Sequence, residues 1–193
     1  MVGAAPSFGE VHLARTLFLL SEKPVGRKRL VKLLGVGEGS VRTIIKKLSS
    51  KGFLLSSKQG HSLSRKGAGE VRRILGCFAR PVEFHSTDVP GPKQSLVVVR
   101  EAADRIRKIG VDERDVAVRA GASGSVIMVF KEGKVGFPSD HFDAGKFKDL
   151  EAKLASITLT ENDVVVISFA DSSTSAEDGA LAVALALSDL KLA

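Results

Sequence analysis

The chain of 193 residues lacks tryptophan and tyrosine and has a single cysteine, Cys77. With one thiol it cannot form an intrachain disulfide, and such cysteine usage is typical of a reducing compartment, so we expect a cytoplasmic protein. The longest uninterrupted apolar run, from Ala180 to Leu187, is much shorter than the roughly 20 residues that a helix needs to cross a bilayer. These absences exclude a disulfide scaffold and argue against a membrane protein.

Acidic residues are scarce in the first part of the chain. Residues 1–80 contain 16 Lys and Arg but only 4 Asp and Glu, a net charge of +12. Residues 81–193 contain 13 basic and 18 acidic residues, a net charge of −5, which leaves +7 for the whole chain. This division predicts two domains with different partners, the first facing an anionic polymer. We expect its cations to remain unpaired, without compensating acids four residues away.

The basic part has the pattern of three helices followed by a hairpin. Apolar residues recur at helical spacing, and Gly35 and Gly52 are placed to end the second and third helices. Two helices joined by a tight glycine turn and followed by a hairpin are typical of a winged helix-turn-helix domain. The predicted elements are helices over residues 10–22, 26–34 and 38–50, strands over 53–55 and 61–63 around the polar turn 56–60, and a basic helix after residues 64–67.

The third predicted helix is suited to duplex DNA. A helix about 10–12 Å across fits the major groove, roughly 12 Å wide, and its non-core face carries hydroxyl and cationic side chains. The hairpin and the cations that open the second helix are placed to reach the phosphate backbone. Since Trp and Tyr are absent and Phe8, Phe18 and Phe53 are assigned to the core, no stacking platform for single strands is expected. The predicted contacts to double-stranded DNA are Arg27, Lys28, Arg29, Ser40, Arg42, Thr43, Lys46, Lys47, Lys58, Gln59, His61 and Arg65.

Three segments of this region, residues 24–30, 34–45 and 64–67, have the sequences PVGRKRL, LGVGEGSVRTII and SRKG. They resemble the winged helix of small archaeal transcription regulators, and the resemblance covers residues 8–75. It implies duplex DNA as the partner. In such proteins the winged helix precedes a variable C-terminal effector domain, which in some relatives is a riboflavin kinase or a thiamin-phosphate synthase module. The layout here is similar to that of an archaeal family with an uncharacterised α/β C-terminal domain.

The acidic part alternates apolar strands with helices, which predicts an α/β sandwich of two or three layers. The strand order is not evident from the sequence. The predicted elements are strands over residues 95–99, 126–130 and 163–169, a hairpin turn at 131–134 with a return strand at 135–137, and helices over 101–109, 112–118, 142–157 and 175–190.

We therefore predict a mixed α+β or α/β chain of two domains. Residues 1–80 are expected to form a winged helix-turn-helix DNA-binding domain, and residues 81–193 an α/β domain for dimerisation or effector binding. Because operators with two-fold symmetry favour dimeric proteins, we expect a homodimer.

Two loops of the second domain are candidates for a small ligand. Gly121–Ser125 is rich in small residues that expose backbone N–H groups, and Asp171–Thr174 lies between a strand and a helix, where open α/β sheets bind anions. Each loop also has a structural explanation: a helix end that runs into a strand in the first, and a capping box from Ser175 to Asp178 in the second. The candidate ligand residues are Gly121, Ser123, Gly124, Ser125, Asp171, Ser172, Ser173 and Thr174.

No catalytic or metal-binding pattern is evident. The histidines, His12, His61, His85 and His141, lack metal-ligand spacing, and residues 140–143 are interpreted as a polar loop. We therefore expect a DNA-binding transcription regulator without a cofactor, whose second domain dimerises or senses a small effector. The alternative, by analogy with the kinase- and synthase-bearing relatives, is a metabolic enzyme whose winged helix regulates its own gene.

Overall fold

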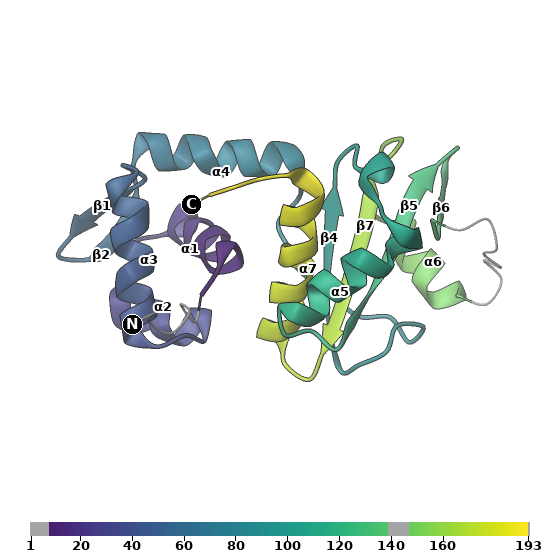
Figure 1. Ribbon diagram of the computed structural model, residues 1–193, viewed down its shortest axis with the longest axis horizontal. Helices are drawn as coiled ribbons and strands as arrows, with labels where there is room; N and C mark the ends of the chain where they lie inside the picture. Colours follow the sequence, from purple (N-terminus) through teal and green to yellow (C-terminus); the bar gives the residue numbers. More distant parts are fainter. Residues whose placement is uncertain (1–7, 139–146, 193) are drawn as a thin grey trace, which may run out of the picture. The chain divides into compact units, whose positions relative to one another are not determined.

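The computed structural model describes residues 8–138 and 147–192 (Figure 1). These residues form seven α-helices, two 3-10 turns and two antiparallel sheets. Contacts within the chain define two compact units, one made of the residues up to Leu75 with Lys191 and Leu192, and the other of Gly76–Leu190. Among the described helices, none combines the length and the apolar character that a membrane span requires.

The N-terminal unit has the element order of a winged helix-turn-helix. Its helices are α1 (Glu10–Glu22), α2 (Arg27–Leu34) and α3 (Glu38–Ser50), followed by the antiparallel strands β1 (Leu54–Ser57) and β2 (Gly60–Leu63) and by α4 (Arg65–Cys77). The periodic apolar residues that predicted these helices form their core, with Leu17, Leu30 and Ile44 fully buried. Gly35 ends α2 in the left-handed region, at φ 68°, as the sequence predicted. The winged-helix part of the predicted fold is therefore confirmed.

The hairpin lies very close to the segment before α2. Val25 and His61 exchange two backbone hydrogen bonds, of 2.9 and 3.0 Å. At the neighbouring Gly60, φ is +124° and a Cβ atom would lie 2.6 Å from the carbonyl carbon of Val25. Only glycine combines this backbone conformation with so close an approach, so Gly60 sets the position of the hairpin against the helices.

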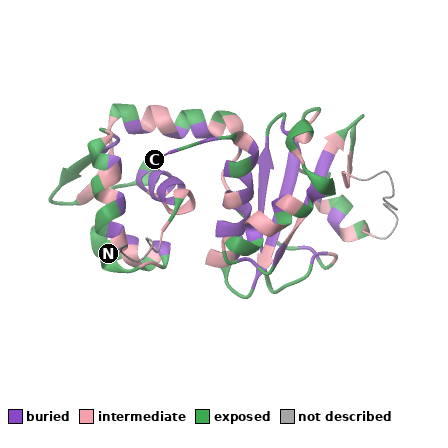
Figure 2. Ribbon diagram, in the orientation of Figure 1, coloured by how far each residue is buried: buried purple, intermediate pink, exposed green. Residues whose placement is uncertain are grey.

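The C-terminal unit is built on a five-stranded sheet. Its strands are β3 (Val82–Phe84), β4 (Lys93–Val99), β5 (Gly124–Lys131), β6 (Lys134–Gly136) and β7 (Val164–Ala170), in the order β3-β4-β7-β5-β6, and all neighbours are antiparallel. The central strand β7 and its neighbour β4 are buried along almost their whole length (Figure 2). Both faces of the sheet are covered, and a strand that is buried on both faces consists of a continuous apolar run. The sequence predicted these strands from such runs.

Helices cover both faces of the sheet. Alternate residues of the strands, such as Leu96, Val98 and Ile167, pack with Leu150 and Leu154 of α6 (Lys148–Leu154). The opposite face packs against α5 (Val111–Arg119) and α7 (Ser173–Ser188). This arrangement confirms the predicted α/β sandwich.

The predicted helix over residues 101–109 is wrong. Two 3-10 turns, η1 (Ala103–Arg105) and η2 (Lys108–Gly110), take its place, and φ is positive at Glu101, Lys108 and Ile109. The backbone N–H of Glu101 donates to Asp163 Oδ1 (3.1 Å), and those of Ala102 and Ala103 donate to the carbonyl oxygen of Asn162 (2.9 and 3.1 Å). These bonds fix the start of the segment on a distant loop, and the positive φ values at 101, 108 and 109 are incompatible with a continuous right-handed helix.

Two further elements differ from the prediction. Strand β3, at the edge of the sheet, was not predicted, because three residues are too few for a periodic signal. Of the predicted helix over 142–157, residues 148–154 are helical (α6) and residues 155–157 are not; residues 142–146 and the predicted polar loop at 140–143 lie outside the described residues.

Candidate nucleic-acid interface

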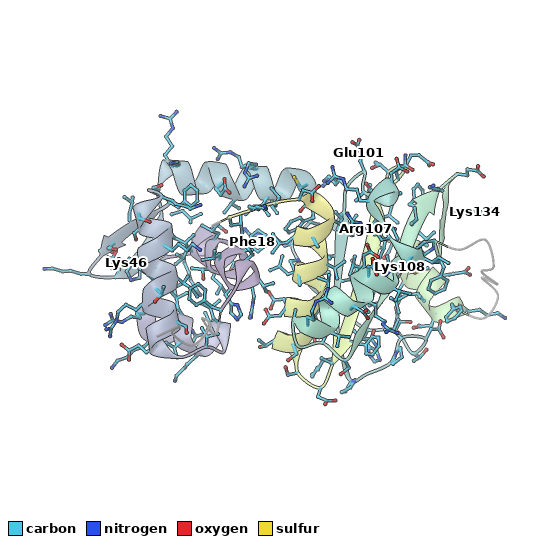
Figure 3. All side chains as sticks on the ribbon, viewed as in Figure 1. Phe18, Lys46, Glu101, Arg107, Lys108 and Lys134 are labelled. Atoms are coloured by element: carbon cyan, nitrogen blue, oxygen red, sulfur yellow. The ribbon has the colours of Figure 1, made fainter. Side chains whose placement is uncertain are left out.

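Helix α3 separates an apolar face from a polar one. Ile44 and Leu48 are fully buried, whereas Thr43, Lys46 and Ser50 are exposed on the opposite side (Figure 3 labels Lys46). Their spacing of three and four residues places all three on one stripe. Sequence reasoning named Thr43 and Lys46 but missed Ser50, although its position four residues after Lys46 predicts the same face.

The hydroxyl groups of this stripe are oriented by the backbone. Thr43 Oγ1 donates to the carbonyl oxygen of Gly39 (3.0 Å), and Ser50 Oγ donates to that of Lys47 (2.8 Å). In this arrangement both oxygens present lone pairs outward. They are therefore suited to accept hydrogen bonds from the amino groups of adenine or cytosine, which are major-groove donors.

The first turn of α2 consists of Arg27, Lys28 and Arg29, all exposed and without an acidic residue among them. The partial positive charge at a helix N-terminus disfavours cations. This turn therefore concentrates positive charge where the dipole of α2 disfavours it. A phosphate group at this position would interact favourably with both the side chains and the helix dipole.

The expectation that the cations of residues 1–80 lack compensating acids is wrong in two places: Arg73 pairs with Glu70 in α4 (3.0 Å), and Glu38 pairs with two arginines. Glu38 Oε1 lies 3.4 Å from Arg27 Nε and 3.6 Å from an Arg42 guanidinium nitrogen. The carboxylate lies in the first turn of α3, where the helix dipole favours it. All three side chains are about half exposed or more, so each pair contributes roughly 0–1 kcal/mol. Glu38 thus orients two arginines without burying them.

The hairpin turn carries Lys58 and Gln59, both exposed. His61, on β2, is half-buried, and its Nδ1 lies 2.9 Å from Ser56 Oγ. Burial, and then the nearby Arg27 charge, lower the pKa of His61 below 6.5. In the free protein His61 is therefore mainly neutral at pH 7 and adds hydrogen-bonding capacity to the hairpin rather than charge.

Arg65 is exposed at the start of α4, next to the base of the hairpin. Ser64 caps this helix: its Oγ accepts from the N–H of Gly67 (3.0 Å) and donates to the carbonyl oxygen of Gly52 (2.6 Å). Of the twelve predicted contacts, nine are exposed and three, Ser40, Lys47 and His61, are half-buried. All twelve lie in the N-terminal unit.

The two candidate ligand loops lie at the same end of the sheet. Gly124 pairs with Phe169 across β5 and β7, so the loop before β5 is next to the loop after β7. Ser172 caps α7 by accepting from the N–H of Ser175 (3.1 Å), so the predicted capping box from Ser175 is wrong. Gly124 is required by packing, since a Cβ there would lie 2.6 Å from the Phe169 ring.

Of the other candidate ligand residues, Gly121 has a φ of +101°. Ser125 has a buried hydroxyl without a hydrogen-bond partner among the described residues. The remaining side chains are exposed or half-buried: Ser123, Asp171, Ser173 and Thr174. Because β5 and β7 are antiparallel, the rule for ligand binding at the ends of parallel strands does not apply to these loops.

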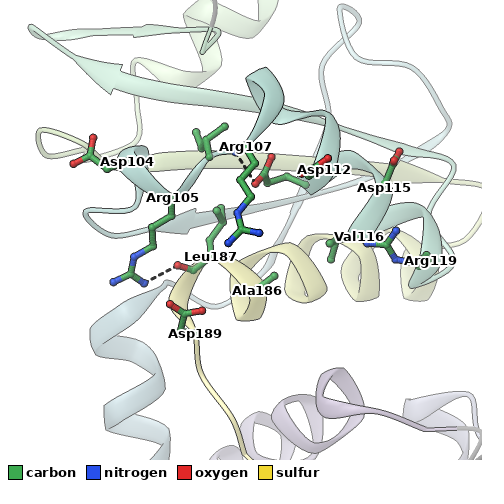
Figure 4. A pocket seen from close by; sticks show the side chains of 12 residues that line it. Asp104, Arg105, Arg107, Asp112, Asp115, Val116, Arg119, Ala186, Leu187 and Asp189 are labelled. Carbon is green, nitrogen blue, oxygen red and sulfur yellow. Dashed lines mark hydrogen bonds between the residues drawn. The ribbon is translucent and has the colours of Figure 1, made fainter.

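A cavity of about 590 Å³ lies elsewhere in the C-terminal unit, between the segment 104–107, α5 and the end of α7 (Figure 4). The side chain of Arg105 donates to the carbonyl oxygen of Leu187 (2.7 Å). Within the described chain, no carboxylate forms an ion pair with Arg107 or Arg119. The lining acids Asp112 and Asp115 pair instead with cations outside the lining, at 3.2 Å each.

Glu113 is a buried carboxylate in the wall of this cavity, 6% exposed. Its Oε1 accepts from the backbone N–H of Arg107 (3.1 Å), while Oε2 has no hydrogen-bond partner within the described chain. Sequence reasoning missed this cavity because its walls come from three separate segments. Nowhere in the described chain do three His, Cys, Asp or Glu side chains form a metal-binding group.

Comparison with known proteins relates both parts of the chain to described families. The model "PH0730-like, N-terminal domain" matches residues 12–69, which include all twelve predicted DNA contacts, and "Domain of unknown function (DUF4443)" matches residues 90–187. The chain is similar to the solved structure "Hypothetical protein PH0730 from Pyrococcus horikoshii OT3", with 28% identity over 95% of this chain and 94% of that one and a TM-score of 0.77. No curated protein matches the chain.

Proposed function

Because the chain belongs to the DUF4443 family, whose name records no activity, we propose its function from its geometry: it is a transcription regulator that binds double-stranded DNA through its N-terminal unit. The observation that carries this proposal is the exposed stripe of Thr43, Lys46 and Ser50 on α3, flanked by the cationic start of α2 and by the hairpin. Helix α3 enters the major groove, and the flanking elements contact the phosphate backbone.

The charge of these elements supports a nucleic-acid partner over a protein partner. From Pro24 to Ser64 the chain has nine Lys and Arg residues and one acid, Glu38. Protein interfaces are depleted in lysine, whereas phosphate contacts supply most of the affinity for DNA. Since aromatic platforms are missing here, a duplex fits this surface better than a single strand.

The proposal is tested by measuring binding to duplex genomic fragments from low to moderate salt. We expect the logarithm of the association constant to fall linearly with the logarithm of salt concentration, because each neutralised phosphate releases counterions. Lys46→Ala should weaken binding by about 1–3 kcal/mol if Lys46 contacts a base, or lower the salt slope by about one if it contacts phosphate. Lys134→Ala, an exposed lysine of β6 in the other unit, is the matched control and should leave binding unchanged. Absence of salt-sensitive binding would refute the proposal.

A separate observation favours small-molecule sensing by the C-terminal unit. Arg107 and Arg119 lack acidic partners within the described chain, and Glu113 Oε2 lacks a donor there, on the walls of one cavity. A ligand that combines an anionic group with an N–H or O–H donor, such as an amino acid or a hydroxy acid, would satisfy both kinds of group. We infer that this cavity, rather than the two candidate loops, receives the effector.

Thermal shift measurements with amino acids, hydroxy acids, nucleotides and inorganic phosphate test this second function. A bound ligand should raise the melting temperature with its concentration, and Arg107→Ala should remove the shift. Ser173→Ala in a candidate loop is the control and should preserve it. A shift that survives Arg107→Ala would place the site elsewhere, and a turnover assay on any ligand found distinguishes sensing from the enzyme alternative.

A further inference from the structure

The outward face of α5 exposes aliphatic side chains. Val111 and Val118 are each 46% exposed, and Ile109, just before the helix, is 63% exposed. The inward face of the same helix buries Glu113 and Ala117. Residues 111, 114, 115 and 118 are spaced by three and four positions, so the two valines form one outward stripe with Arg114 and Asp115 between them.

The stripe on one copy of the chain is complementary in charge and polarity to the same stripe on a second copy. When two copies of a helix pack antiparallel about a two-fold axis, a step forward along one helix faces a step back along the other. The residue numbers of two facing positions therefore have a constant sum. With the axis between Arg114 and Asp115, Val111 faces Val118 of the second copy and Arg114 faces Asp115 of the second copy. The same two contacts repeat on the other side of the axis. Each charge meets its opposite and each valine meets a valine.

The two charged side chains also interact within one copy. An Arg114 guanidinium nitrogen lies 3.2 Å from Asp115 Oδ1, and both side chains remain about half exposed. Across the two-fold axis, the two pairs therefore join into one cluster of four alternating charges. A network of several charges is worth more than an isolated exposed pair.

Ile109, two residues before α5, also indicates that a partner covers the start of this helix. Ile109 has a φ of 62°, a conformation that is strained for a β-branched residue. Its side chain remains largely exposed within the chain, so packing inside the unit does not offset this strain. A partner that covers the start of α5 would bury this side chain.

We propose that α5 is the dimerisation surface of this protein and that its partner is a second copy of the same chain, packed antiparallel through Val111, Arg114, Asp115 and Val118. One helix from each copy makes a smaller contact than the standard interface of about 1,600 Å², in the size range of weak and transient associations. The pairing deepens the proposed function, since a two-fold protein suits a DNA site with inverted half-sites. The pairing itself forms without DNA.

The test is sedimentation of the full chain without DNA, from micromolar to near-millimolar concentration, so that its outcome is independent of DNA binding. The wild-type chain should dimerise. Arg114→Asp alone gathers four carboxylates at the two-fold axis, and Asp115→Arg alone gathers four guanidinium groups, so each single variant should be monomeric. The side chains of Arg114 and Asp115 are about half exposed, although Asp115 also lines the cavity beside α5, and circular dichroism checks that the variants fold.

Two rescue experiments identify the antiparallel arrangement. The double variant Arg114→Asp/Asp115→Arg should dimerise again, and a mixture of the two single variants should form a heterodimer in which opposite charges face each other across the axis. Lys134→Asp, on β6, is the control and should leave the dimer intact. A monomeric wild-type chain, single variants that still dimerise, or a mixture that stays monomeric would each overturn the proposal.

Discussion

At the scale of a single residue, Gly60 fixes where the hairpin lies against the segment before α2. A Cβ atom there would lie within 2.8 Å of three backbone atoms of Val25 and Gly26, and the backbone conformation favours glycine. Backbone atoms cannot move aside as a flexible side chain can. The glycine therefore links a local conformation to the position of residues 58, 59 and 61, which we propose to contact DNA.

Gly60→Ala should accordingly lower the free energy of unfolding by about 1–3 kcal/mol, since it adds both backbone strain and a steric clash. Urea denaturation of the purified variant measures this effect. Gly76→Ala is a matched control, because a Cβ at Gly76 in α4 meets nothing within 4 Å, and replacing a helical glycine by alanine stabilises a helix by about 0.5–1 kcal/mol. Equal stability of the two variants would show that the close approach at Gly60 is absent.

At the scale of the element, α2 has a charge distribution that works against its own stability. Its first turn carries three cations and no acid, whereas Lys32 in its last turn has the favourable sign for the helix dipole. The proposed DNA contacts account for this arrangement. The same cations that weaken the helix are the ones that a phosphate would neutralise.

Lys28→Glu should therefore raise the free energy of unfolding by about 0.3–1 kcal/mol while it weakens DNA binding. Lys32→Glu, the same substitution at the other end of α2, should lower stability by a similar amount. Denaturation and duplex binding are measured on both variants. A Lys28→Glu protein that is less stable than the wild type, or that binds DNA as tightly, would contradict this account of the first turn.

At the scale of the whole molecule, the charge is divided between the two parts of the chain. Residues 1–80 carry +12 and residues 81–193 carry −5, so a polyanion is attracted to the first and repelled by the second. The proposed effector cavity and the proposed dimerisation helix both belong to the C-terminal unit. Under these proposals, DNA binding and its regulation fall on separate units.

Local periodicity was sufficient to predict the N-terminal elements: α2, α3 and α4 each bury one face, and a proline or a glycine follows α1, α2 and α3 within two residues. The buried strands β4, β5 and β7 were equally evident as β-branched runs. The candidate contacts on α3 followed from the same periodicity, since the face opposite the core is the one available to a groove. Only Ser50 and the ion pairs of Glu38 were missed there.

The sequence by itself determined which segments are helix or strand in the N-terminal unit, which of their faces are polar, and where the positive charge lies, because these depend on neighbours within a few residues. Tertiary structure alone decided the strand order, the 3-10 turns at 103–110 and the arginine-lined cavity. Each of these depends on hydrogen bonds or packing between residues far apart in the chain, such as Glu101 with Asp163 or Arg105 with Leu187. Such pairings leave no periodic trace in the sequence.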